Sequence, residues 1–115
     1  MIVPRLSTGV DITQRLAGAT FSTSGFASGA RISVVRELGA WNTAGSEFKV
    51  RCLVNGQGPF GFSTPVTIPV GGGVAVLTAA QLAAATAIDV RQDTAQSSVS
   101  PVYVTITIEA AEPQG

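Results

Sequence analysis

Alternation of apolar and polar residues with a period of two is the feature that most constrains the fold of this chain. It is clearest in VYVTITIEA (residues 102–110), where Val and Ile alternate with Tyr, Thr and Glu. FKVRCLV (48–54) repeats it, and RISVVREL (31–38) and TPVTIPV (64–70) contain shorter versions. A period of two with one polar face is typical of strands buried on one side only. The sequence therefore predicts an all-β fold, an antiparallel β-sandwich or barrel of about seven or eight strands.

The apolar positions of these segments predict one shared core. Pro65 and Pro69 confine their strand to the edge of a sheet, because proline has no N–H to donate to a ladder. Cys52 is the only cysteine and lies on the apolar face of its strand, so we expect a buried, inert thiol. The residues expected in the core are Val50, Cys52, Val66, Ile68, Ile88, Val104 and Ile106.

One stretch, LTAAQLAAATAIDVRQD (77–93), begins as a helix and ends as a strand. Thr78 and Gln81 have the spacing of a capping box, and alanine is the best helix former. The sequence predicts one short helix near residues 79–85, which crosses between the two sheets with Leu82 pointing inward. A partner-binding helix is the alternative, although so short a helix is marginal on its own.

The first 29 residues have a different composition from the rest. AGATFSTSGFASGA (17–30) is small, polar and rich in glycine, and such a stretch buries little surface by itself. We interpret residues 1–29 as an extended arm or an edge strand, and residues 30–115 as the sandwich domain. An arm of this kind would gain its stability from a surface on which it lies.

Charge is scarce along the whole chain. Only 12% of the residues are charged, and seven basic side chains balance seven acidic ones. Neutrality argues against binding to nucleic-acid phosphates or to an anionic membrane surface. No apolar run approaches the roughly 20 residues of a membrane helix, and no signal peptide is evident, so we expect a protein made without export. So little charge favours a surface that is partly covered by copies of the chain or by a partner.

Catalytic chemistry finds little support in the residue types. The chain has no histidine, which removes Ser-His and Cys-His catalysis, and Lys49 is the only lysine available to a Ser-Lys pair. Asp89 and Asp93 lie four residues apart, but two carboxylates fall short of the six or more oxygens usual around calcium. We therefore expect no enzyme activity, no cofactor and no metal site, and interpret the two aspartates as surface residues.

Aromatic residues in glycine-rich segments are the candidates for partner binding. Phe60 and Phe62 lie in the loop QGPFGF (57–62), where they either form an exposed contact or plug the end of the sandwich. Trp41, in GAWNTAG (39–45), has the same two interpretations and could also stack on a sugar. Phe21 and Phe26 of the N-terminal segment need a surface to cover them.

In style, the whole chain resembles the small structural proteins of tailed-bacteriophage virions, notably capsid decoration (cement) proteins. FKVRCLV, VTIPV and VYVTITIEA, together with the Gly/Ser/Thr-rich N-terminus, carry the resemblance. It implies a β-sandwich or β-tulip that forms homo-oligomers, commonly trimers, and binds a major capsid or other virion protein to stabilise the particle. It also implies location in the virion after synthesis in the host cytoplasm. The alternative function is a recognition module, either immunoglobulin-like or carbohydrate-binding.

Overall fold

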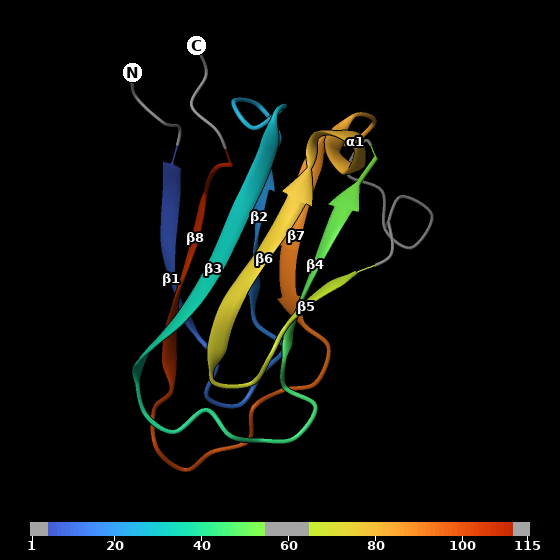
Figure 1. Cartoon of the computed structure of the whole chain (residues 1–115). Helices are drawn as coiled ribbons and strands as arrows, with labels where there is room; N and C mark the ends of the chain where they lie inside the picture. Colours follow the sequence, from blue (N-terminus) through green and yellow to red (C-terminus); the bar gives the residue numbers. More distant parts are fainter. Residues whose placement is uncertain (1–4, 55–64, 112–115) are drawn as a thin grey trace.

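The computed structural model describes residues 5–54 and 65–111 and contains two antiparallel sheets that face each other (Figure 1). Sheet A has the strand order β1-β8-β3-β6, and sheet B has the order β2-β7-β4-β5. The predicted all-β sandwich is confirmed, with eight strands and one short helix in the described part of the chain. Sheet A consists of β1 (Arg5–Asp11), β8 (Tyr103–Ala110), β3 (Gly29–Leu38) and β6 (Gly72–Thr78). Sheet B consists of β2 (Gly18–Ser22), β7 (Ala87–Gln92), β4 (Phe48–Leu53) and β5 (Val66–Ile68).

The core lies between the two sheets and follows the period-two pattern. In β8 every second residue is buried while its neighbours face outward, and β4 repeats this with Phe48, Val50 and Cys52. The predicted common core is confirmed: six of its seven members are buried in one cluster, and Val66 packs against that cluster from the edge strand β5. Cys52 is buried and forms no disulfide, as expected.

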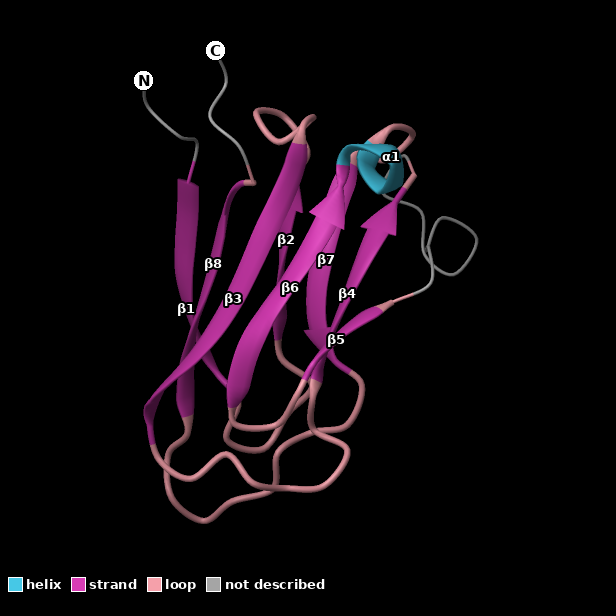
Figure 2. Cartoon of the chain, in the orientation of Figure 1, coloured by secondary structure: helices cyan, strands magenta, loops and turns pink. Residues whose placement is uncertain are grey.

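The short helix lies where the sequence places it, at one end of the sandwich (Figure 2). Helix α1 (Ala79–Leu82) connects β6 of sheet A to β7 of sheet B. Both bonds of the capping box are present: Thr78 Oγ1 accepts from the Gln81 backbone N–H at 3.2 Å, and Gln81 Oε1 accepts from the Thr78 N–H at 2.8 Å. Leu82 is buried and closes that end of the core. The helix ends at Leu82, earlier than the predicted residue 85, and residues 83 and 84 form a turn.

The edge strand β5 is kept short by the two prolines that flank it. It has only three residues, lies at the edge of sheet B, and is flanked by Pro65 and Pro69. After it, the chain crosses to sheet A through a turn in which the Gly72 N–H donates to the Pro69 carbonyl. Gly71 and Gly72 both have positive φ angles, 99° and 115°, which glycine adopts without steric cost.

The N-terminal segment belongs to the sandwich itself. Of the two interpretations, arm or edge strand, the structure has two edge strands: β1 pairs with β8 in sheet A, and β2 pairs with β7 in sheet B. Ile12 and Ala17, between these strands, are buried in the common core. The expected division at residue 30 therefore does not separate an arm from the sandwich within the described residues.

No helix in the described ranges is both long and apolar enough to cross a membrane.

Candidate interaction surface

Three of the five aromatic candidates are part of the core rather than of the surface. Phe21 and Phe26 are buried, the first on the inner face of β2 and the second in the turn before β3. Trp41 is 4% exposed, and its ring meets that of Phe48 edge-on with centroids 5.5 Å apart. These side chains offer no aromatic face to a partner or a sugar. Phe60 and Phe62, with the QGPFGF loop, lie outside the described residues.

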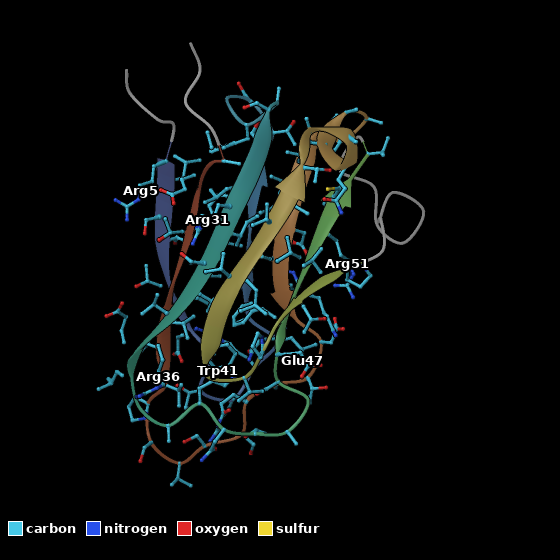
Figure 3. The ribbon with its side chains drawn as sticks, viewed as in Figure 1. Arg5, Arg31, Arg36, Trp41, Glu47 and Arg51 are labelled. Atoms are coloured by element: carbon cyan, nitrogen blue, oxygen red, sulfur yellow. The ribbon has the colours of Figure 1, made fainter. Side chains whose placement is uncertain are left out.

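The Trp41 indole is held by a buried polar cluster at the end of the sandwich opposite α1 (Figure 3). Its Nε1 donates to the carbonyl and the hydroxyl of Ser46, at 3.1 and 3.0 Å. Gln92 Nε2 also donates to the Ser46 carbonyl, at 2.8 Å, while Gln96 Oε1 accepts from the Thr43 backbone N–H at 3.1 Å. Buried polar groups need such partners, so this cluster fixes the loops that close that end of the core.

Asp89 and Asp93 do not form a joint site. Asp89 is 5% exposed and accepts from Thr20 Oγ1 at 2.9 Å and from Arg91 at 3.3 Å. Asp93 pairs with Arg51 at 3.1 Å. Within residues 5–54 and 65–111 there is no group of three or more His, Cys, Asp or Glu side chains that could hold a metal ion.

The outer face of sheet B is a charged surface whose charges are paired. Besides the two aspartate pairs, Lys49 Nζ lies 3.4 Å from a Glu47 carboxylate oxygen. The register aligns Lys49 with Arg91, and Arg51 with Asp89, across β4 and β7. Glu47 and Arg51 are visible along the β4 side of the molecule in Figure 3. Although Lys49 and Arg91 carry like charges, each of the three cations described on this face lies within 3.4 Å of a carboxylate, so this face has little need of an external charge.

The outer face of sheet A has a different character. In the register of β1, β8, β3 and β6, one row joins Ser7, Thr107, Ser33 and Val74, and the next joins Gly9, Thr105, Val35 and Gly72. Neither row contains a charge. The charges of this face lie in its outer rows: toward the α1 end Arg31 lies 4.0 Å from Glu109 and Arg5 stands beside Glu109 in the register, and at the opposite end Asp11 stands beside Tyr103. Five apolar or aromatic side chains on this face are at least 40% exposed: Val35, Leu38, Val74, Val76 and Tyr103.

A hollow of about 370 Å³ lies between the edge strands β1 and β2. It is lined by Thr8 to Asp11, Arg15 to Gly18 and Arg91. Asp11 at its rim accepts hydrogen bonds on Oδ1 from the Thr13 hydroxyl and the Thr13 backbone N–H, at 2.5 and 2.9 Å. These bonds, with a smaller contribution from the Arg15 guanidinium, hold the pKa of Asp11 below its ordinary value, so the carboxylate is charged at neutral pH.

Sequence reasoning identified the outward residues of β8 but not the face that they form with β6. A signal for it was present: residues 52–88 form an uninterrupted run of 37 residues without Asp, Glu, Lys or Arg. The described part of this run forms β5, β6 and α1, which lie together on one side of the sandwich. A charge-free run of this length marks an edge and a face that the protein does not protect with charge.

No protein-family model matches this chain, and no curated protein matches it significantly.

Proposed function

We propose that this protein is a structural component of an ordered assembly, and that it works by packing the outer face of sheet A against neighbouring subunits. The observation that carries the proposal is the exposure of Val35, Leu38, Val74, Val76 and Tyr103 on one face of sheet A whose two central rows have no charge. Contiguous exposed apolar surface is uncommon on a soluble monomer and marks an interaction site.

The contrast between the two sheets supports this proposal. Sheet B presents ion pairs to its surroundings, whereas sheet A presents Ser, Thr and Val. Covering the exposed Val side chains removes apolar surface from water and is favourable, and Ser and Thr hydroxyls cost far less to desolvate than the charges of sheet B. A neighbour in an assembly would therefore be expected on sheet A.

The resemblance to small virion proteins suggests which kind of assembly this is. In that setting the protein self-associates and binds a major capsid protein or another virion protein, stabilising the particle. The low overall charge agrees with a surface that is covered in use. The recognition-module alternative has lost one of its reasons, because the Trp41 ring that could have stacked on a sugar is buried.

The test compares two identical substitutions at different places. Val74→Lys adds a charge to the centre of the sheet A face, beside uncharged Ser33, whereas Val99→Lys adds the same charge to a fully exposed loop. Sedimentation velocity over a wide range of concentrations should show that the wild type and Val99→Lys associate alike. Val74→Lys should associate about tenfold or more weakly, since its charge would have to be desolvated at the contact. Equal association of all three proteins would refute the proposal.

A further inference from the structure

The edge strand β1 has an unpaired row of backbone groups. Ile12 N–H donates to the Val102 carbonyl at 2.9 Å, in the same register that pairs Arg5 with Glu109. Hydrogen bonding alternates along an antiparallel strand, so Leu6, Thr8 and Val10 also direct their backbone groups toward β8. Arg5, Ser7, Gly9 and Asp11 therefore direct theirs toward the free edge. No other strand in the described ranges pairs with that edge.

This edge is less protected than the edge of sheet B formed by β5. Natural edges are usually short or interrupted by proline, and β5 is both, with three residues between Pro65 and Pro69. β1 has seven residues and no proline within it. Leu6, on the core side of β1, is 49% exposed because nothing described covers it. Together these features leave a hydrogen-bonding edge beside an uncovered apolar side chain.

We propose that β1 pairs with β1 of a second copy of this chain, antiparallel, about a two-fold axis at Thr8. The proposal rests on the self-association part of the proposed function and names its contact. In this register the whole strand overlaps itself: Arg5 faces Asp11 of the other copy, Leu6 faces Val10, and Ser7 faces Gly9.

Charge complementarity selects this partner and this register. A two-fold contact places each residue i opposite residue 16 − i, so the strand's only two charges, Arg5 and Asp11, meet twice with opposite sign. Arg5 and Asp11 direct their backbone N–H and C=O groups toward the free edge, and so do Ser7 and Gly9. The pairs Arg5–Asp11 and Ser7–Gly9 can therefore exchange backbone hydrogen bonds between the two copies. A register displaced along the strand keeps neither the full overlap nor the charge pairs.

Asp11 has intramolecular contacts that the pairing must accommodate. Its Oδ1 accepts from Thr13, its Oδ2 lies 3.5 Å from Arg15 Nη2, and its carbonyl accepts from Arg15 Nε at 3.4 Å. The Arg15 side chain is 68% exposed and can turn aside. A carboxylate has about four lone-pair sites, so Asp11 can accept from Arg5 of the second copy while it keeps its bonds to Thr13.

The pairing would join two copies of sheet A into one eight-stranded sheet. The strand order would be β6-β3-β8-β1 followed by β1-β8-β3-β6 of the second copy. The Ser/Thr/Val outer faces would become continuous, so the dimer would present twice the contact surface to the assembly. The exposed Leu6 side chain would gain a cover in Val10 of the second copy.

A cysteine at the two-fold axis tests the register directly. Thr8 would face itself in a pair without hydrogen bonds, with Cα atoms roughly 4.5 Å apart, within the range that a disulfide spans. Leu6 would face Val10, so two cysteines at position 6 would be about 13 Å apart along the strands. Under mild oxidation of the full chain, Thr8→Cys should give a covalent dimer and the matched control Leu6→Cys should not. Cys52, being buried, should not contribute. Cross-linking of both variants, or of neither, overturns the proposal.

A proline at the edge tests the hydrogen bonds. Ser7→Pro removes an N–H that points to the free edge, while Ser7→Ala removes only the hydroxyl that lies 3.1 Å from Thr107 Oγ1. With circular dichroism unchanged, Ser7→Pro should dimerise about tenfold or more weakly than Ser7→Ala, and equal dimerisation would contradict the pairing. Adding Val74→Lys to Thr8→Cys separates the two proposals, because β6 lies at the opposite edge of sheet A from β1. If Thr8→Cys cross-links and Val74→Lys does not weaken association, only the proposed function is refuted. If Thr8→Cys does not cross-link and Val74→Lys weakens association, only the β1 contact is refuted.

Discussion

At the scale of single residues, stability depends on the inward positions of the long central strands. Ile106 is fully buried in β8, the strand that pairs with both β1 and β3. Ile106→Ala should lower the free energy of unfolding by about 2 to 4 kcal/mol, because it removes buried methyl groups and leaves a cavity. Urea denaturation measures the loss. Thr105→Ala, on the outer face of the same strand, should cost far less, and a loss below about 0.5 kcal/mol for Ile106→Ala would contradict its place in the core.

Ionisation of Asp11 should make the free energy of unfolding depend on pH in the acidic range. Its pKa in the folded protein is lowered by the Thr13 hydrogen bonds, so its contribution is present above the pKa of the unfolded chain and is lost as the pH falls through the folded pKa. Thr13→Ala should raise the pKa of Asp11 and flatten this dependence, while Thr13→Ser should preserve both. NMR titration of the Asp11 carboxyl, with unfolding measured from pH 7 downward, gives both quantities; an unchanged pKa in Thr13→Ala would show that the hydroxyl is not the main cause.

The burial of some residues can be predicted from the sequence and that of others cannot. The difference lies in how far along the chain their packing partners are. Val104 and Ile106 lie in a regular alternation, which a local pattern reveals. Phe21 and Phe26 are isolated among Gly, Ser and Thr, so no local pattern shows that they are buried. Their burial depends on strands such as β7, which pairs Ile88 with Phe21 from 67 positions later in the chain. The prediction that these two aromatic residues bind a partner was wrong for the same reason.

At the scale of elements, local signals were sufficient for α1 and for β5. The Thr78–Gln81 capping box and the two prolines act within a few residues of themselves, so the helix start and the edge strand could be predicted. The edge strands β1 and β2 could not be assigned with the same certainty. They consist largely of small polar residues, and β1 is defined by its pairing with β8, about 100 residues away.

Because β1 pairs with β8, deletion of the N-terminal segment should affect the stability of the sandwich itself. Deleting residues 1–20 removes β1 together with the buried Ile12 and Ala17, and it uncovers the β8 edge. The shortened chain should lose the cooperative unfolding transition of the full chain, because part of the core is missing together with ten paired positions, seven in β1 and three in β2. Thermal unfolding followed by circular dichroism is the measurement. A cooperative transition close to that of the full chain would mean that the N-terminal segment is the dispensable arm that its composition suggests.

At the scale of the whole molecule, the two sheets differ in what their outer surfaces carry. Sheet B pairs its charges with one another, while sheet A leaves a Ser/Thr/Val face and the β1 edge without partners among the described residues. Composition predicts that some surface is covered in use, and the strand order shows which face carries the exposed apolar side chains. The eight strands could be expected from the sequence, whereas the asymmetry of the sandwich follows from strand pairings that no single segment encodes.

The molar mass of the wild-type protein in solution, measured by light scattering as a function of concentration, tests the central claim most directly. A structural component with an uncovered apolar face should reach a mass of at least two chains well below its solubility limit, and the mass should not fall when salt is raised, because the main contact is apolar. A mass of 11.7 kDa at every concentration and salt would be that of one chain, and it would contradict the claim that this protein is built to assemble.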